Sequence, residues 1–346
     1  MQISNAIYGF SGLVREKYLD EGAQFKVELY RNPTEDSEMP KLVAVKTAKV
    51  TTGLEDEENA VPPPGGRSGR NDLLSFVQEM QVLSHLPFQA HPNILRLLGS
   101  SWTSDTHGTP IPQLIVEYAS LGNLSDMLRK SVPLGTQTKL DLSFDIVNGL
   151  QHIHTCGIAH GDMKLSNIMV FPMESSRGMF TAKISDFGSS IARDDPDERK
   201  IYWGSPGYCP PDAQTEIGMS MPNLQKCDSF ALGLCVWDIF NDGKSFYESD
   251  QSTLIRSGRD VPLNYPFLDK ANEFLDRIHL EVDRAPIADA IHLGGETVPE
   301  PKKLAVRPLV KNLLHGLLDP IRSLRWSSKE TLQYFIDECV PILHFI

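Results

Sequence analysis

A chain of 346 residues is long enough for about two domains and a sizeable core. Its 40% apolar and 23% charged residues are ordinary values for a globular protein, which excludes a short peptide scaffold and wholesale disorder. The net charge of −12, from 33 Lys and Arg against 45 Asp and Glu, repels nucleic acid at long range, so we expect no nucleic-acid partner.

Residues 1–20 contain no apolar block of signal-peptide length. The longest strongly apolar run, Phe230–Trp237, is far shorter than the ~20 residues of a membrane helix, so no membrane span is expected. The five cysteines are odd in number and form no Cys-x-x-Cys pair, which argues against a disulfide framework and a zinc site. We therefore expect an intracellular protein of a reducing compartment, cytoplasmic or nuclear.

Two short apolar stretches near the start of the chain, Gln24–Tyr30 and Leu42–Val45, are separated by the turn formers Asn32-Pro33 and Met39-Pro40. This pattern predicts antiparallel strands of a small sheet. Residues 51–71 follow, with an acidic run and then a stretch rich in Pro and Gly. Because this composition has nothing to bury, we interpret these residues as a disordered insertion.

An amphipathic helix is predicted next, because apolar residues recur at steps of three and four from Leu73 to Leu86 and Asp72 can cap its start. The strand-like runs Ile94–Leu98 and Leu114–Tyr118 complete the small sheet. Helical periodicity dominates the remainder of the chain. The predicted helices lie around Leu140–His154, Phe230–Phe240, Ala305–Leu318 and Lys329–Leu343.

The most specific chemical signal lies in two nearby segments, His160-Gly161-Asp162-Met163-Lys164-Leu165-Ser166-Asn167 and Asp186-Phe187-Gly188. Asp162, Asn167 and Asp186 supply the oxygen ligands and the base that phosphoryl transfer with Mg²⁺ requires. In these segments the chain resembles the eukaryotic protein kinase family, serine/threonine type, with His-Gly-Asp where many members have His-Arg-Asp.

This resemblance implies an α+β, protein-kinase-like fold of two lobes. The N-terminal lobe would hold a small antiparallel sheet with one main helix, and the C-terminal lobe would be larger and mainly helical. Residues 1–117, with the insertion 51–71, would form the first lobe and residues 118–346 the second. ATP and Mg²⁺ are the implied cofactors, and the implied partners are protein substrates. The sequence predicts no oligomeric state.

The resemblance also implies roles for residues of the catalytic loop. Asp162 would be the catalytic base, and Lys164 would neutralise charge on the transferred phosphoryl group. Asn167 and Asp186 would be the metal ligands. The histidine of this loop, His160, is interpreted as a packing residue of the family's regulatory column, together with Phe187, Leu83 and Leu97.

Other residues match the family's nucleotide-binding positions. Lys46, in Val43-Ala44-Val45-Lys46, would hold the α- and β-phosphates, with Glu79 on the amphipathic helix as its ion-pair partner. Backbone groups of Glu117 and Ala119 would bind the adenine edge, and Val116 would be the gatekeeper. The remaining ATP-binding positions implied by the resemblance are Gly22, Val27, Ala44 and Met169.

The phosphate-binding loop departs from the family's pattern. Leu19–Val27 stands in place of the glycine-rich loop, and only its middle glycine, Gly22, is present. Glycines there let the backbone approach the phosphates closely. Asp20, in place of the first glycine, brings a carboxylate toward a polyanion, which should weaken nucleotide binding unless the side chain turns outward.

A second departure is Gly161, where many family members have an arginine that pairs with a phosphate on the later segment. We therefore predict that activity does not require phosphorylation between Asp186 and Asp212. Accordingly, non-phosphorylatable residues at Ser189, Ser190, Tyr202 and Ser205 are expected to leave activity within a few-fold.

Two charged residues have expected structural roles. Asp212, in Pro210-Pro211-Asp212 where the family has Ala-Pro-Glu, would pair with Arg325. Asp228 would belong to the helix that anchors the catalytic loop, as would Gly233.

The leading functional hypothesis is a serine/threonine protein kinase that transfers the γ-phosphate of ATP to a protein hydroxyl, because Lys164 and Gly204-Ser205 resemble that branch. Tyrosine specificity is an alternative within the same family. A pseudokinase scaffold or nucleotide-binding module is a second alternative, suggested by the missing loop glycines. A small-molecule phosphotransferase is a third, because such enzymes also resemble His-Gly-Asp at the catalytic loop.

Overall fold

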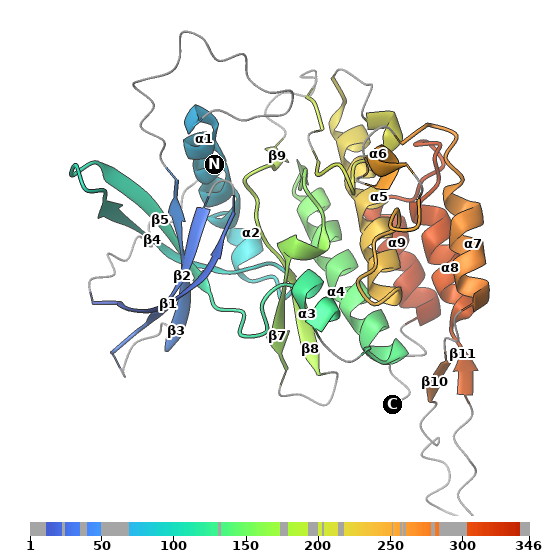
Figure 1. The fold of residues 1–346 in the computed structure, drawn as a ribbon, viewed down its shortest axis with the longest axis horizontal. Helices are drawn as coiled ribbons and strands as arrows, with labels where there is room; N and C mark the ends of the chain where they lie inside the picture. Colours follow the sequence, from blue (N-terminus) through green and yellow to red (C-terminus); the bar gives the residue numbers. More distant parts are fainter. Residues whose placement is uncertain are drawn as a thin grey trace, which may run out of the picture. The chain divides into compact units, whose positions relative to one another are not determined.

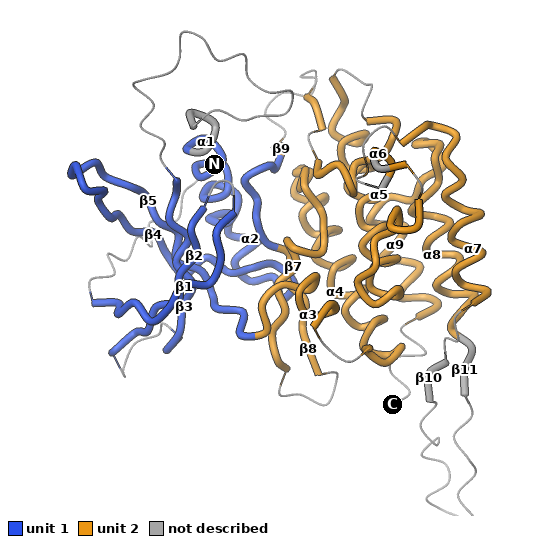
Figure 2. The backbone as a smooth tube through the Cα atoms, in the orientation of Figure 1, with its two compact units in different colours: residues 1–120, 185–190 blue, residues 121–184, 191–346 orange. Residues whose placement is uncertain are grey.

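The computed structural model describes residues 12–22, 25–34, 40–49, 69–130, 133–173, 179–192, 200–202, 204–213, 218–250, 252–256, 258, 261–277, 281–283 and 303–339. The chain divides into two units, shown in Figure 2. The first unit is Met1–Ser120 with Ser185–Ser190, and the second is Leu121–Ile184 with Ile191–Ile346. The first unit thus extends three residues past the expected boundary at 117. It also includes Ser185–Ser190, which follow much later in the chain.

A five-stranded antiparallel sheet forms most of the first unit (Figure 1). Its order is β1-β2-β3-β5-β4, and the central strand β3 is buried along most of its length because it is flanked on both sides. The strands are β1 (Val14–Glu21), β2 (Phe25–Arg31), β3 (Leu42–Ala48), β4 (Leu97–Ser104) and β5 (Pro110–Glu117).

The predicted amphipathic helix is α1, Gly69–Leu83. Its apolar residues Phe76 and Val82 are buried, and Phe76 packs with Phe25 and Leu114 of the sheet. Leu86, which the prediction included in this helix, instead begins the separate short helix α2 (Leu86–Gln89) and is exposed. The expected insertion lies outside the described residues up to position 68, and Gly69–Asn71 belong to α1.

Two long helices form the core of the second unit. In α4 (Thr136–Thr155), buried Leu142, Ile146 and Leu150 recur at steps of four, as a helix with one covered face requires. In α5 (Met221–Phe240), every residue from Cys227 to Phe240 is buried, so that no face of the helix is exposed to solvent along that stretch. The polar residue Asp228 therefore lies in the interior.

The remaining elements of the second unit surround these helices. There are two short antiparallel pairs, β6 (Ile158–Ala159) with β9 (Ile191–Ala192) and β7 (Ile168–Pro172) with β8 (Phe180–Ile184). In sequence, β6 precedes residues 160–167 and the other three strands follow them. A third pair is β10 (Glu281–Asp283) with β11 (Lys303–Ala305). The other helices are α3 (Leu124–Lys130), α6 (Thr253–Arg256), α7 (Phe267–Arg277), α8 (Arg307–Leu317) and α9 (Ser328–Tyr334), the last continued by a π-helical turn over Phe335–Cys339.

This architecture confirms the α+β prediction of a small N-terminal antiparallel sheet with one main helix and a larger, mainly helical C-terminal part. The boundaries differ at two elements. The helix predicted to begin at Phe230 begins at Met221, and the strand predicted at Ile94–Leu98 begins only at Leu97. Among the described residues, no helix combines the length and the apolar character that crossing a bilayer would require.

Candidate functional site

Asp162 lies at the centre of a small polar network in the second unit. It follows β6 and precedes the single helical turn Leu165–Asn167. Its carboxylate accepts hydrogen bonds from Lys164 Nζ at 2.7 Å, and from Ser205 Oγ at 2.7 Å and Ser205 N at 3.0 Å. Lys164 Nζ also donates to Ser205 Oγ at 3.0 Å. Ser205 thus contacts both catalytic-loop residues through its single hydroxyl group.

The network keeps Asp162 ionised. Burial by itself raises the pKa of the Asp162 carboxyl, but the Lys164 ammonium and the hydrogen bond from Ser205 outweigh it and hold the pKa below its ordinary value. Each hydrogen bond to a charged group is worth roughly 1.5–3 kcal/mol. At neutral pH the group is therefore a carboxylate that can accept a proton.

Asn167 is turned toward the same residue. Its amide Nδ2 donates to the backbone oxygen of Asp162 at 2.8 Å and lies 3.3 Å from Oδ2. Asn167 is 5% exposed, so this orientation is fixed by its surroundings. With its nitrogen engaged in this way, Asn167 would offer a metal ion its amide oxygen, the atom that Mg²⁺ prefers.

Asp228, fully buried in α5, holds the catalytic loop by its backbone. Its Oδ2 accepts from the amide of His160 at 2.7 Å, and its Oδ1 accepts from the amide of Gly161 at 3.0 Å. The Tyr202 hydroxyl donates to the same Oδ1 at 3.0 Å. Gly161 has a φ of 81°, a conformation that glycine adopts without strain. The expected anchoring role of Asp228 rests on these contacts.

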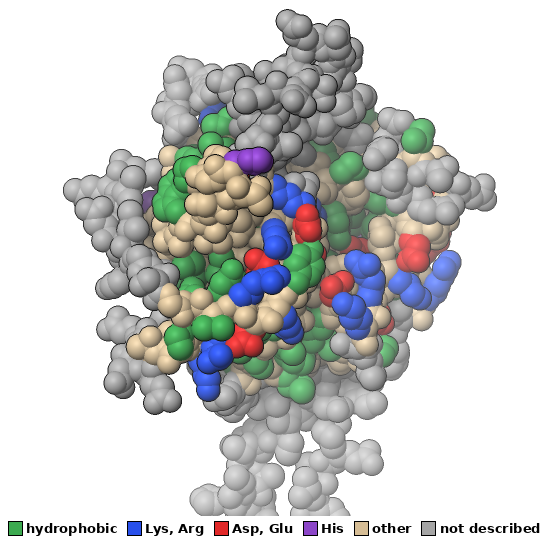
Figure 3. All heavy atoms as spheres, turned by 60° about the vertical axis from the view of Figure 1, so that its left-hand side comes forward, with side chains coloured by type: hydrophobic (Ala, Val, Ile, Leu, Met, Phe, Trp, Pro, Cys, Tyr) green, Lys and Arg blue, Asp and Glu red, His purple; other side chains and the backbone are tan. Residues whose placement is uncertain are grey.

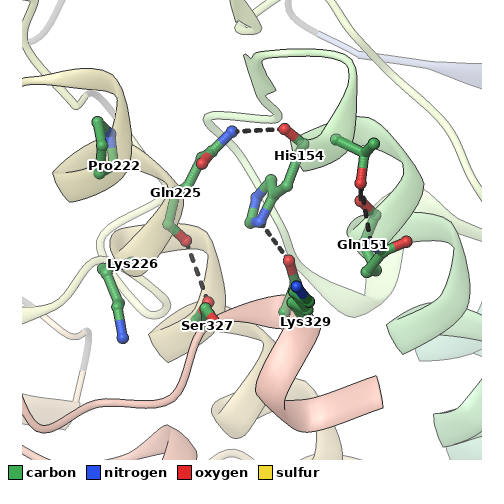
Figure 4. A pocket seen from close by; sticks show the side chains of 10 residues that line it. Gln151, His154, Pro222, Gln225, Lys226, Ser327 and Lys329 are labelled. Atoms are coloured by element: carbon green, nitrogen blue, oxygen red, sulfur yellow. Dashed lines mark hydrogen bonds between the residues drawn. The ribbon is translucent and has the colours of Figure 1, made fainter. Parts of the chain in front are cut away.

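His154 supports Asp228 from the other side. Its Nε2 lies 3.0 Å from Asp228 Oδ2, and its Nδ1 lies 2.7 Å from Ser328 Oγ in α9. Figure 4 shows the imidazole directed toward the first residues of α9, with the Gln225 amide reaching the His154 carbonyl at 2.9 Å. These residues line a cavity of about 220 Å³. His154 therefore serves as a structural link between α4, α5 and α9.

The first unit contains the second group of predicted site residues. Lys46 Nζ on β3 lies 2.5 and 2.7 Å from the two carboxylate oxygens of Glu79 on α1, and 4.0 Å from Asp186 Oδ1. Glu79 is fully buried and Lys46 is 9% exposed. Burial would lower the pKa of Lys46, but the carboxylates of Glu79 and Asp186 raise it above its ordinary value, so the ammonium stays charged.

Asp186 is held in an unusual backbone conformation, with a φ of 64°. A left-handed backbone at a residue other than glycine costs free energy and is characteristic of functional sites. Phe187, the next residue, is fully buried, and its ring centroid lies 5.9 Å from that of Phe88 in α2. Leu83, the expected partner of Phe187, is also buried, whereas the contact with Phe88 was not expected.

Phe25 was also missed, although it stands where the family's loop has its third glycine. Its ring is 5% exposed and belongs to the cluster that includes Phe76 of α1. Lys46 Nζ lies 4.4 Å from the ring centroid, within the range of a cation–π interaction. The ammonium is therefore enclosed by Glu79, Asp186 and an aromatic ring.

Strands β1 and β2 pair as far as Glu21 and Lys26, and Gly22 N donates to Phe25 O at 2.9 Å. Asp20 is exposed, and its carboxylate accepts from the amide of Glu21 at 2.7 Å. Figure 3 shows Lys and Arg side chains interleaved with Asp and Glu side chains on one face. Arg31 of β2 and Glu16 of β1 form an ion pair, with Nε 2.5 Å from Oε1.

The predicted adenine-binding residues fall in both units. In the first unit, Val116 pairs with Ala44 across β5 and β3, and Val27 on β2 pairs with Lys46. Glu117 accepts from the amide of Arg96 through its side chain at 2.8 Å, and Ala119 is buried just beyond β5. The last of the predicted set, Met169, lies on β7 of the second unit and forms a bridge with Asn123.

Asp212 forms the expected ion pair with Arg325, at 3.3 Å from Nη2 to Oδ1, in the second unit. A second arginine was not anticipated: Arg322 Nε lies 2.6 Å from Asp212 Oδ2. Arg325 is 1% exposed, so the shorter Asp side chain in place of the family's Glu still reaches a buried guanidinium.

At Tyr202 and Ser205, replacement by a non-phosphorylatable residue was expected to have little effect on activity. Both side chains, however, form hydrogen bonds. The hydroxyl of Ser205 contacts Asp162, and that of Tyr202 contacts Asp228. Replacing either one removes a hydrogen bond to a buried or half-buried carboxylate. The expected few-fold effect therefore no longer applies to Tyr202 and Ser205.

Comparison with known proteins places these features in a family. The family model described as protein kinase domain matches residues 34–335. A probable LIM domain-containing serine/threonine-protein kinase of Dictyostelium discoideum is 28% identical over 211 residues, covering 58% of this chain and 30% of that protein. The serine/threonine/tyrosine-protein kinase HT1 of Arabidopsis thaliana is 27% identical over 201 residues, or 58% of this chain and 44% of that protein.

Human mitogen-activated protein kinase kinase kinase 13 is 26% identical over 173 residues, which cover 50% of this chain and 16% of that protein. The matched region is thus less than half the length of each of these relatives. The family model, by contrast, covers most of this chain and spans both units. The chain belongs to the protein kinase family.

Proposed function

We propose that the chain is a serine/threonine protein kinase that uses ATP and Mg²⁺. The observation that carries the proposal is the network around Asp162, in which a carboxylate is kept ionised and oriented by Lys164 and Ser205. The names of the relatives support the class of acceptor, since they are serine/threonine or serine/threonine/tyrosine kinases. The substrate of this chain is proposed to be a protein hydroxyl.

In the proposed reaction the substrate hydroxyl donates its proton to the Asp162 carboxylate. The oxygen of the substrate hydroxyl forms a bond to the γ-phosphorus of ATP. The bond between that phosphorus and the oxygen that bridges it to the β-phosphorus breaks, and ADP leaves. Lys164, held 2.7 Å from Asp162, offsets negative charge on the group being transferred.

The remaining predicted residues hold the nucleotide. Lys46, kept charged beside Glu79, would contact the α- and β-phosphates. Asn167 and Asp186 would hold Mg²⁺, which supplies charge neutralisation at the phosphate oxygens when bound. Backbone groups of Glu117 and Ala119 would bind the adenine edge.

The test is transfer of radiolabelled γ-phosphate from Mg-ATP to a generic basic protein and to the chain itself. Wild type is compared with Asp162→Asn, which keeps the shape but cannot accept the proton. We expect transfer to fall by at least 100-fold, in line with the 10²–10⁴-fold contribution of general base catalysis. Asp126→Asn, an exposed residue of α3, is the matched control and is expected to retain wild-type transfer.

Nucleotide binding is measured on the same proteins. Binding of Mg-ATP without transfer by the wild type would contradict the kinase proposal and favour a nucleotide-binding scaffold or a small-molecule acceptor. Equal transfer by wild type and Asp162→Asn would overturn the role of Asp162. Phosphoamino-acid analysis of the product then decides between serine or threonine and tyrosine.

A further inference from the structure

Tyr202 connects the segment that carries Ser205 to the residue that holds the catalytic loop. Its ring is 3% exposed and packs in a cluster with Cys209, Met219 and Cys227 of the second unit. Its hydroxyl, at the far end of the ring, donates to Asp228 Oδ1 at 3.0 Å. A buried hydroxyl that reaches a buried carboxylate is a specific contact, because either group alone would be costly to bury.

The Asp228 carboxylate is satisfied only when Tyr202 is in place. Two donors serve Oδ2, the amide of His160 and His154 Nε2. Two donors serve Oδ1, the amide of Gly161 and the Tyr202 hydroxyl. Removal of the hydroxyl would leave Oδ1 with the single amide of Gly161, in a position with no exposure to water.

The neighbouring residue Gly204 makes room for this arrangement. A Cβ atom built on Gly204 would lie 2.5 Å from Cε1 of the Tyr202 ring, too close for any side chain. Glycine is needed at position 204 because the Tyr202 ring lies close to its Cα atom, and not because of its backbone freedom. The Tyr202 ring is therefore held by the hydrogen bond of its hydroxyl, and it fits in this position because residue 204 has no side chain.

We infer that Tyr202 is a positioning residue that sets the orientation of Asp162, by anchoring residues 160–161 through Asp228 and by placing Ser205 against the Asp162 carboxylate. Only Trp203 and Gly204 separate Tyr202 from Ser205 in the chain. The anchored ring thus limits where the Ser205 hydroxyl can lie. Loop and segment thus meet at two carboxylates, that of Asp228 through Tyr202 and that of Asp162 through Ser205.

The inference rests on the proposed kinase function for its effect on rate, and its first test is Tyr202→Phe. This variant keeps the ring and removes only the hydroxyl. We expect kcat to fall by about tenfold or more, whereas KM for ATP changes less than twofold, because no proposed nucleotide-binding residue is touched. Tyr334→Phe is the control, since Tyr334 donates its hydroxyl to Leu309 O in the helical part of the same unit. It is expected to retain wild-type kcat.

Hydrogen exchange gives a readout that does not depend on catalysis. In Tyr202→Phe, the amides in a peptide spanning residues 158–165 are expected to exchange at least tenfold faster than in wild type and in Tyr334→Phe. Gly204→Ala, which displaces the ring, is expected to have the same effect. Unchanged exchange together with unchanged kcat in Tyr202→Phe would overturn the positioning role.

The two proposals fail in different ways. If wild type transfers no phosphate, the kinase proposal fails, and exchange in the 158–165 peptide still decides whether Tyr202 orders the loop. If wild type is active and Tyr202→Phe keeps wild-type kcat and exchange, only the role of Tyr202 is lost. A fall in kcat with unchanged exchange would also contradict the proposed route through Asp228.

Discussion

After Lys164, the hydroxyl of Ser205 contributes to the lowered pKa of Asp162, and it also orients the carboxylate. It donates to Oδ1 at 2.7 Å and is one of the causes that lower the pKa of Asp162. Ser205→Ala removes this hydrogen bond, so the pKa of Asp162 should rise. Because a base must be deprotonated to act, the acidic limb of the pH profile of kcat should then move to higher pH.

The measurement is kcat of phosphate transfer as a function of pH for wild type, Ser205→Ala and Ser205→Thr. We expect Ser205→Ala to lose about tenfold or more in kcat at neutral pH, and Ser205→Thr to recover most of it because the hydroxyl is restored. An acidic limb at the same pH in wild type and Ser205→Ala would contradict the electrostatic role, even if kcat itself falls.

The sequence located the site residues that lie in short motifs and missed those that act across the fold. Lys46 on a strand and Glu79 on a helix are 33 residues apart in the chain, yet the resemblance to the kinase motifs predicted their ion pair. Lys46 Nζ lies 2.5 Å from Glu79 Oε1. Phe25 carries no such signal, because its ring reaches Lys46 only through the packing of the sheet on α1. The contact between Tyr202 and Asp228 likewise has no signal in the sequence. The two residues lie 26 positions apart and meet only in the folded chain.

At the scale of elements, the contact of α5 with the end of α8 depends on one glycine. A Cβ atom on Gly233 would lie 2.7 Å from Leu318 Cδ2 and 2.8 Å from Leu317 Cβ. Gly233→Ala therefore forces the two elements apart, and overpacking of this kind costs typically about 1–3 kcal/mol. We expect the free energy of unfolding to fall by that amount in chemical denaturation.

Gly207→Ala is the matched control, because a Cβ atom built there has no neighbour within 4 Å. Its unfolding free energy should stay within about 0.5 kcal/mol of wild type, as for substitutions away from packed sites. Equal stability of Gly233→Ala and wild type would show that α5 and α8 can separate without cost, contrary to the close packing expected of a protein interior.

Helices and strands were predictable from the sequence where one face is buried and the other is exposed to solvent. The helix from Leu73 was found because α1 has such a face, whereas β1 was missed because nearly all its residues are exposed and its charges alternate without an apolar row. The first turns of α5 were missed because they show little apolar pattern. From Met221 to Lys226 only Leu224 is buried.

At the scale of the whole molecule, the proposed chemistry draws on residues from both units. Lys46, Glu79 and Asp186 belong to the first unit, and Asp162 and Asn167 to the second. Asp186 joins the first unit although it follows β8 of the second in the chain. If Asn167 and Asp186 are metal ligands, as the family resemblance implies, substitution of either residue should abolish a metal-dependent property.

Thermal unfolding with ADP tests this, because ADP binds without turnover. A ligand at 100 times its Kd stabilises the native state by about 2.7 kcal/mol. We expect Mg²⁺ with ADP to raise the unfolding temperature of wild type further than ADP with EDTA. In Asp186→Asn and in Asn167→Ala this additional rise should disappear, whereas Asp126→Asn should keep it. Persistence of the additional rise in either variant would contradict the metal-ligand role of the residue that it replaces.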